Sequence, residues 1–323
     1  MLPRLAVAAL LGALAQGPAA AQEAFPNRPI RFVVPFAPGG PSDIVARIMA
    51  PRMTATLGQP VIVDNRSGAN SLVATEALAR EAPDGHSLMV STLSHSVNAI
   101  LQPQARYDPL RDFSPVGLLA MLPLILVTGP GAPFETVDAL VAAARARPGE
   151  ISYGSAGHGG SAHLAGALLV TLTGTQLTHV PFRGNGPALS EVMAGRVSFI
   201  FYPMIGIADH IARGQLRALG VSTPRRHADY PAVPTMAEAG FPGFEDYTQG
   251  LGVLAPARTP QPVVERLNAA ILASLTRPET NARLKGLGAI VAPSSPDEFA
   301  AFLAQDLGRW RRVITQADIR AQE

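Results

Sequence analysis

The chain of 323 residues contains no cysteine, and this absence excludes several kinds of site. Without thiols it can form no disulfide, no cysteine-based metal site, no thiol nucleophile and no lipid anchor attached to cysteine. Lysine is nearly absent as well, because Lys285 is the only one and arginine carries almost all of the positive charge. The formal net charge is +2 and no basic run stands out, so the composition does not predict a nucleic-acid partner.

Long hydrophobic runs are also scarce, and the clearest one lies at the N-terminus. Arg4 precedes an apolar block over residues 5–15, and the small residues Ala19, Ala20 and Ala21 follow it. This order predicts a secretory signal peptide over residues 1–21, cleaved near Ala21, and therefore a periplasmic protein. No later stretch reaches about 18 apolar residues without a charge or a proline, so the mature chain is expected to be soluble.

The remaining chain of about 300 residues is longer than one hydrophobic core comfortably holds, which predicts two domains. Strand-like runs at 30–36, 61–65 and 87–92 alternate with helix-like runs at 41–57 and 72–80. This alternation is typical of a parallel, doubly wound α/β sheet. We expect two such lobes with a hinge and a central cleft. Lobe one is predicted over residues 22–122 plus 250–323, and lobe two over residues 123–249.

The second lobe and the C-terminal part repeat the same pattern. Helices are expected over 137–145, from Gly160 onward, and over 187–194, with a short helical patch at 236–239 inside a turn-rich loop. Strands are expected at 124–128, 151–153, 177–182, 197–202, 216–222 and 251–257. Two helices should end the chain, the last opened by a capping box of Ser295 and Glu298.

Three glycine-rich turns each connect a strand to a helix: PFAPGGPSD (35–43), YGSAGHGGSAH (153–163) and FRGNGP (182–187). Free backbone N–H groups and the positive end of the helix dipole at such turns attract anions. Ligands of open α/β sheets bind beyond the carboxyl ends of the strands. Because the first turn belongs to lobe one and the others to lobe two, we expect a small anion to be held from both sides.

Other interpretations of the second turn are weaker. Residues 157–162 fit a dinucleotide pattern, but Arg183 stands where the ribose-binding acid should follow the next strand. The alternative function is an exported serine hydrolase using Ser155 or Ser161 with His158, although Tyr153 stands where a nucleophile elbow needs glycine. His158 and His163 are five residues apart and do not share a helix face, so no metal site and no cofactor are expected.

Several long segments resemble the Bug-type periplasmic solute-binding proteins of tripartite tricarboxylate transporters. They include PNRPIRFVVPFAPGGPSDIVAR, GQPVIVDNRSGAN, YDPLRDFSPVGLLA, YGSAGHGGSAHLAG and HVPFRGNGPALSEVMAGRVSF, in the family's order. The resemblance implies a type II periplasmic-binding-protein-like fold and no catalysis. It implies that loops 36–43 and 155–161 hold a ligand carboxylate through backbone groups and ordered water. The ligand would be a di- or tricarboxylate or an aromatic acid, captured by a monomer for integral membrane permease subunits or for sensing.

The candidate ligand-binding residues lie mostly on these turns. They are Phe36, Ala37, Pro38, Gly39, Gly40, Asp43, Ser155, Ala156, Gly157, Gly159, Ser161, Gly184 and Tyr202. The chain departs from the family at residues 68–71, GANS, where Gly-Ala-Gly-Gly is frequent. It also departs at Phe201 and Tyr202, where an Asp is frequent. Tyr202 either lines the far side of the pocket, favouring a planar acid, or belongs to the core.

Overall fold

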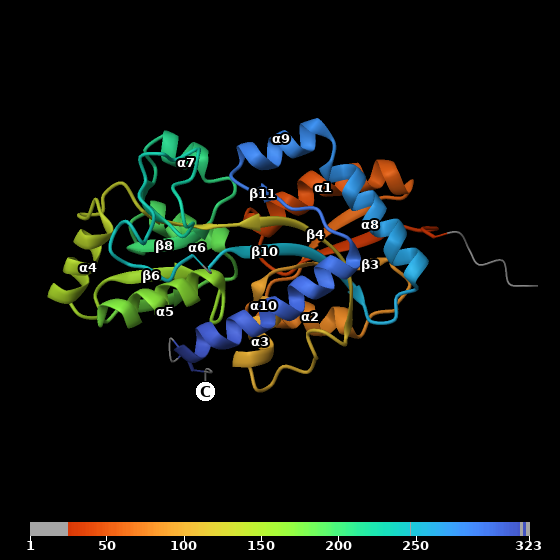
Figure 1. Cartoon of the computed structure of the whole chain (residues 1–323), viewed down its shortest axis with the longest axis horizontal. Coiled ribbons are helices and arrows are strands. Elements are labelled where there is room, and N and C mark those ends of the chain that lie inside the picture. The colour runs from red at the N-terminus through yellow and green to blue at the C-terminus, as the bar shows by residue number, and fades with distance from the viewer. Residues whose placement is uncertain (1–24, 246, 317–318, 321–323) are drawn as a thin grey trace, which may run out of the picture.

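The computed structural model describes residues 25–245, 247–316 and 319–320, so the signal peptide predicted over residues 1–21 lies outside the described residues. Two β-sheets lie side by side, each flanked by helices (Figure 1). Below, lobe one and lobe two denote the parts that carry the first and the second sheet, and their limits remain those predicted from the sequence. In the part of the chain that is described, no helix combines the length and apolar character needed to cross a bilayer.

The first sheet has six strands in the order β11-β4-β10-β3-β1-β2. Its strands are β1 (Ile30–Val34), β2 (Val61–Asn65), β3 (Ser87–Ser91), β4 (Phe113–Leu122), β10 (Gln249–Pro256) and β11 (Ile290–Val291). Its helices are α1 (Pro41–Leu57), α2 (Leu72–Ala79), α3 (Leu93–Leu101), α8 (Gln261–Leu275), α9 (Pro278–Gly286) and α10 (Pro296–Gln316). The central strands are buried on both faces, as their apolar sequences predict.

The second sheet has five strands in the order β7-β6-β8-β5-β9. Its strands are β5 (Leu124–Thr128), β6 (Ser152–Ser155), β7 (Thr178–Pro181), β8 (Phe199–Pro203) and β9 (Arg217–Val221). Its helices are α4 (Val137–Ala146), α5 (Ser161–Thr173), α6 (Asn185–Met193) and α7 (Ala208–Ala212). Strands β6, β7 and β8 are parallel and end toward lobe one, which is where α5 and α6 begin.

The sheets are mixed, whereas the sequence pattern predicted parallel sheets. Strand β10 runs antiparallel to β3 and β4, and β5 runs antiparallel to β8 and β9. Both strands come directly from the other lobe, β5 after Pro123 and β10 at Gln249, and no crossover helix within the same sheet fixes their direction. A pattern of alternating helices and strands carries no information about such a reversal.

Helix α10 joins the two lobes (Figure 1). At its start, Phe299 and Phe302 lie against Gly252 and Gly250 of β10, where an added Cβ would come within 2.1 and 2.6 Å of the two rings. At its other end, the buried Trp310 packs edge-on to Tyr247 at 5.5 Å, within an apolar cluster that includes lobe two strands and α3. This apolar cluster therefore spans both lobes.

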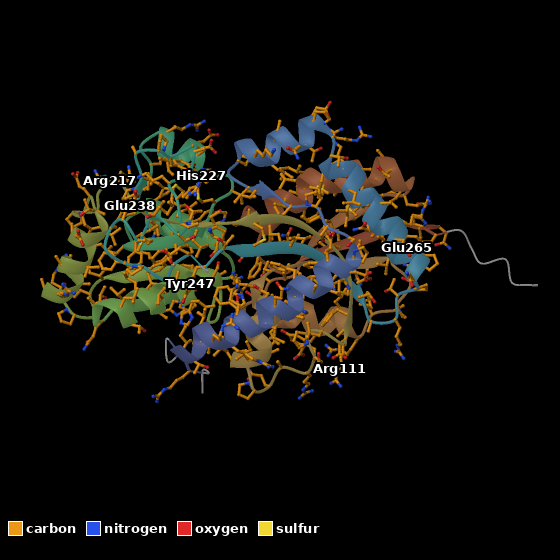
Figure 2. All side chains as sticks on the ribbon, in the orientation of Figure 1. Arg111, Arg217, His227, Glu238, Tyr247 and Glu265 are labelled. Atoms are coloured by element: carbon orange, nitrogen blue, oxygen red, sulfur yellow. The ribbon has the colours of Figure 1, made fainter. Side chains whose placement is uncertain are left out.

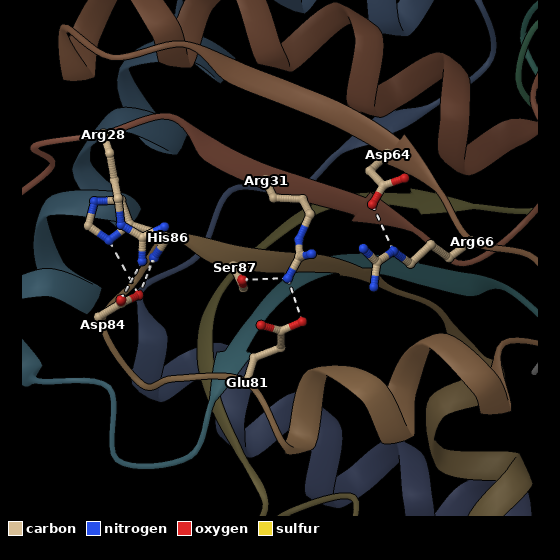
Figure 3. A network of polar contacts seen from close by, with 8 residues as sticks. All are labelled: Arg28, Arg31, Asp64, Arg66, Glu81, Asp84, His86 and Ser87. Carbon is tan, nitrogen blue, oxygen red and sulfur yellow. Dashed lines mark hydrogen bonds and ion pairs between the residues drawn. The ribbon is translucent and has the colours of Figure 1, made fainter.

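Ion pairs connect neighbouring segments in the outer part of the first sheet (Figure 3). Arg31 of β1 contacts Glu81 and donates to Ser87 Oγ at 3.0 Å, which ties the segment after α2 to β1 and β3. Asp84 is held by Arg28 at 2.7 Å and by the backbone N–H of His86 at 2.9 Å. The charged residues labelled in Figure 2, such as Arg111, Arg217 and Glu265, also lie at the periphery of the molecule.

The C-terminal elements confirm the capping box but not the number of helices. The N–H of Ser295 donates to Glu298 Oε2 at 2.8 Å, and the N–H of Glu298 donates back to Ser295 Oγ at 3.2 Å. Three helices occur after β10 instead of two, because α9 follows α8 almost directly, with Pro278 at its first position. Helices α3 and α7 were not predicted, and residues 236–239 form turns instead of a helix.

Candidate ligand-binding site

Four helix N-termini converge on one enclosed pocket between the lobes. Helix α1 follows β1, α3 follows β3, α5 follows β6 and α6 follows β7, so each begins at the carboxyl end of a strand. The pocket holds about 20 Å³, room for one or two water molecules. Its lining is made of Phe36, Gly40, Pro41, Ser42, Ser94, Ala156, Gly160, Ser161, Asn185 and Gln249.

The pocket is electrically suited to an anion although none of its lining residues is charged. The N-cap residues of α1, α5 and α6 are Gly40, Gly160 and Gly184, and none of them caps its helix with a side chain. The first N–H groups of these helices therefore have no side-chain acceptor, and the helix dipoles add positive potential. The hydroxyl of Ser161 is buried and has no protein partner. An anion in the pocket would accept hydrogen bonds from this hydroxyl and from the helix N–H groups.

Asp43 holds the first turn in shape and does not line the pocket. Its Oδ2 accepts from the N–H of Gly39 and from Arg47, both at 2.9 Å, and its Oδ1 accepts from Asn65 at 3.0 Å. Burial opposes ionisation of this carboxyl, but the hydrogen bonds from Arg47, Gly39 and Asn65 outweigh it and keep the pKa below its usual value. The negative charge of Asp43 is thus compensated by its own hydrogen-bond partners, outside the lining of the pocket.

The turns of the two lobes meet in two pairs. The N–H of Ala37 donates to the carbonyl of Arg183 at 3.1 Å, and a Cβ on Gly186 would lie 3.1 Å from the backbone of Gly39. In the second pair, Asn70 faces the second glycine turn, where a Cβ on Gly157 would lie 3.2 Å from Asn70 Cβ. Glycine is favoured at Gly186 because an added Cβ would meet backbone atoms, and at Gly157 because its φ of 125° is one that residues with side chains rarely adopt.

Asn70 belongs to this meeting of the turns, although it was not among the residues predicted from the sequence. It has a φ of 50°, between Ala69 and Ser71 that are also left-handed, and asparagine tolerates this region better than most residues. Ser94 donates to its Oδ1 at 2.9 Å, and Asn98 donates to its carbonyl at 2.7 Å. The sequence held one indication of this turn, because residues 68–71 read GANS where Gly-Ala-Gly-Gly is frequent in the family that the chain resembles. Ser94, Asn185 and Gln249 were missed as well, although Ser94 follows a strand as the predicted turns do.

A second cavity adjoins the enclosed pocket and shares Phe36 and Ala156 with it. It is more open and holds about 290 Å³. Its polar lining comes from Asn70, Gln102, Gln104, His158 and Arg183. Burial lowers the pKa of His158, which leaves Arg183 as the cationic group of this cavity. Together the two cavities offer one site for an anionic group and a larger space with amide and guanidinium donors.

The predicted ligand residues do not all line the two cavities. Phe36, Gly40, Ala156 and Ser161 line the enclosed pocket, and Gly157 lines the second cavity. Ala37, Gly39, Gly159 and Gly184 make the contacts between turns, whereas Pro38 is exposed at the tip of its turn. Tyr202 lies in the core of lobe two, lines neither cavity, and has its pKa raised by burial. Its core position is the second of the two roles considered for it.

The serine–histidine pair of the hydrolase alternative is not assembled. Ser155 is fully buried and hydrogen-bonds to Gly157 and to His179 Nε2, the latter at 2.6 Å. His158 Nε2 instead donates to the carbonyl of Arg320 at 2.9 Å. Ser161 Oγ has no protein partner that could act as its base. The Ser155 hydroxyl therefore stabilises the conformation of the second turn through its hydrogen bonds to Gly157.

Comparisons with known proteins find one family profile and several relatives that match most of the chain. The profile of the tripartite tricarboxylate transporter family receptor matches residues 45–319. A protein of Pseudomonas sp. strain P51, named for its place in the tcbD–tcbE intergenic region, is 41% identical over 302 residues, covering 93% of this chain and 90% of that protein. Protein BugT of Bordetella pertussis is 36% identical over 296 residues, covering 91% of this chain and 90% of BugT.

Solved structures are similar over the whole fold. The periplasmic binding protein BugD superposes with a TM-score of 0.89 at 33% identity, covering 92% of this chain and 100% of BugD. MatC from Rhodopseudomonas palustris, solved with bound malate, gives 0.86 at 34% identity, covering 90% of this chain and 100% of MatC. A second R. palustris protein, solved with adipate, gives 0.88 at 33% identity, covering 92% of this chain and all of that one.

Proposed function

This chain belongs to the tripartite tricarboxylate transporter receptor family, and from that premise we propose that it captures a small dicarboxylate between its lobes in the periplasm. The observation that carries the proposal is the buried, unpartnered hydroxyl of Ser161 at the N-terminus of α5, beside the uncapped N-termini of α1 and α6. A carboxylate accepts hydrogen bonds from all of these donors without needing an arginine.

The sizes of the two cavities support a ligand that is longer than a single carboxylate group. The enclosed pocket of about 20 Å³ admits one small polar group, and the adjoining cavity of about 290 Å³ takes the rest of the ligand past Phe36 and Ala156. Arg183, Gln102 and Gln104 supply donors for a second polar end. Malate and adipate, which occupy two similar solved proteins, are dicarboxylates of suitable kind.

The captured ligand would pass to integral membrane permease subunits or to a sensor. The family profile supports this role because it describes a receptor of a transport system. No catalytic step is part of the proposal, since the serine and histidine residues of the second turn hold the backbone in place.

The function is tested by ligand binding to the purified chain after bound acids are removed by partial unfolding and dialysis. Mono-, di-, tri- and aromatic carboxylates are screened by thermal unfolding, followed by calorimetry on those that raise the melting temperature. A ligand at about 100 times its Kd should stabilise the fold by roughly 2.7 kcal/mol. Absence of any shift across the screen would overturn the proposal, as would fluorophosphonate labelling of Ser155 or Ser161.

A further inference from the structure

Three histidines gather at the second glycine turn, and none of them lines the enclosed pocket. His158 belongs to the turn, His163 to α5 and His179 to β7. Each offers a ring nitrogen, and the three nitrogens lie within 4.8 Å of one another. The ring of His163 is centred 4.3 Å from that of His158 and 4.4 Å from that of His179. His179 lies on a separate strand, so the sequence alone did not place it beside His158 and His163.

Two of these rings are already oriented as metal ligands usually are. His158 Nε2 must donate to the carbonyl of Arg320 at 2.9 Å, because a carbonyl only accepts, so Nδ1 keeps its lone pair. His179 Nε2 lies 2.6 Å from Ser155 Oγ, and with the hydroxyl proton directed to the carbonyl of Gly157, Nε2 donates and Nδ1 keeps its lone pair. Histidine ligands typically donate their second nitrogen to a carbonyl or similar acceptor in this way.

The third ring is linked to the turn itself. His163 Nδ1 accepts the backbone N–H of Gly159 at 3.1 Å, so its proton resides on Nε2. Coordination by His163 therefore requires that the hydrogen bond to Gly159 be released. An ion bound at this cluster would thus change the hydrogen bonding of the second glycine turn. Because that turn contacts Asn70 of lobe one, the change would also affect the contact between the lobes.

The surroundings keep all three rings neutral, which is the form that binds metals. Burial lowers the pKa of His163 to about 2, with contributions from His179 and His158, and burial lowers the pKa of His179 to about 4. At neutral pH no proton has to be displaced from these imidazoles. His158 also lines the second cavity, which provides a path for an ion from solvent.

We propose that His158, His163 and His179 form a binding site for a divalent transition-metal ion of the imidazole-preferring class, with Zn²⁺ as the representative. Three imidazoles and one water complete a tetrahedral site of the kind that keeps an open position. The three histidines are absent from the lining of the enclosed pocket, and His158 alone of the three lines the second cavity.

The test uses the full chain without an affinity tag, freed of metal by chelation, and titrated with Zn²⁺ by calorimetry. Cobalt(II) is the second probe, because its visible absorption reports tetrahedral nitrogen coordination. The chain has no cysteine, so thiolate cannot contribute to either signal. We expect one equivalent of Zn²⁺ per chain, and His158→Ala and His179→Ala should each weaken binding at least ~10-fold. The matched control is His210→Ala on α7, which should bind as the unmodified chain does.

Circular dichroism and thermal unfolding of the metal-free variants separate lost ligation from lost folding. His158 is half-buried on a turn, and His158→Gln provides a second replacement that keeps a polar side chain there. Failure of the unmodified chain to bind Zn²⁺ would overturn the proposal. Binding that is equally tight in folded His158→Ala, His158→Gln and His179→Ala proteins would overturn it as well.

Discussion

At the scale of single residues, the enclosed pocket relies on neutral polar groups that are buried without protein partners. A buried hydroxyl without a hydrogen bond is costly, and Ser161 carries that cost unless a ligand accepts from it. The nearby Asp43 shows the opposite arrangement, because its carboxylate is fully engaged by Gly39, Arg47 and Asn65. Ser161 is therefore placed for binding, whereas Asp43 is placed for holding the first turn.

Replacing Ser161→Ala should weaken carboxylate binding about 10- to 100-fold, because a hydrogen bond to a charged group contributes about 1.5–3 kcal/mol. The unfolding free energy of the ligand-free protein should stay the same or rise, since no protein hydrogen bond is lost and the cost of the unpaired buried hydroxyl is removed. Calorimetry with a ligand found in the screen measures the first effect and urea unfolding the second. Ser190→Ala on the exposed side of α6 is the control, and an unchanged affinity of Ser161→Ala would contradict the assignment.

His95 makes the stability of the fold depend on pH. Burial lowers its pKa to about 4, although the carbonyl of Pro109 and the charge of Asp108 partly oppose this. Between about pH 6.5 and 4 the unfolded chain binds a proton at this residue and the folded chain does not, so acidification favours unfolding. Each pH unit in that window costs up to about 1.4 kcal/mol.

His95→Phe should therefore flatten the decline of the unfolding free energy between pH 6.5 and pH 4.5, measured by urea titration in the presence of a chelator. The change of slope is the relevant quantity, because the variant also loses the hydrogen bond to Pro109, which is 2.8 Å long in the protein. Equal slopes for His95→Phe and the unmodified chain would refute this account.

At the scale of elements, the site is made by helices that begin where parallel strands end. Helices α1, α5 and α6 begin after glycine N-caps, and α6 approaches the first turn closely at Gly186. An added Cβ there would meet the backbone of Gly39 and Gly40 at 3.1 Å, and backbone atoms move aside less readily than a flexible side chain does. A side chain at this helix position would therefore push the two turns apart by a few tenths of an ångström.

Gly186→Ala should weaken carboxylate binding about 10-fold, equivalent to about 1.4 kcal/mol, because the lobes can no longer meet fully. Gly286→Ala is the matched control, since Gly286 is also helical and a Cβ there would meet nothing within 4 Å. Both replacements should favour their helices slightly, by up to about 1 kcal/mol. Calorimetry and urea unfolding are measured on both variants, and equal affinities would show that the contact at Gly186 does not limit closure.

At the scale of the whole molecule, two lobes are joined by two chain crossings and by α10, and their turns touch at the site. The enclosed pocket has no room for a complete dicarboxylate, so access requires the turns to separate. Hinge motion of this kind is the usual way in which two lobes close around a ligand.

A disulfide across the turns tests this motion, because the chain has no cysteine of its own. In an Ala37→Cys, Gly184→Cys double variant the two Cβ atoms would lie 3.6 Å apart, which suits a disulfide. The oxidised protein should exchange ligand at least ~10-fold more slowly than the reduced protein, as followed by stopped-flow fluorescence of Trp310 or by competition. The single variants serve as controls, and equally fast exchange in the oxidised form would show that ligands pass without separation of the turns.

The sequence by itself determined the local features of this protein. Strand, glycine turn and helix follow one another within about ten residues at 35–43, 153–163 and 182–187, and short-range rules for glycine, proline and helix N-termini act over that distance. The end of β4 and the start of β5 around Pro123 were predictable for the same reason.

Only the tertiary structure decided which distant segments meet. It reversed β5 and β10 in their sheets, brought Asn70 and Ser94 to the site, and placed Tyr202 in the core. It also collected His158, His163 and His179 from a turn, a helix and a strand. Composition and periodicity report the environment of each residue along its own element, whereas these arrangements depend on how elements far apart in the chain pack together.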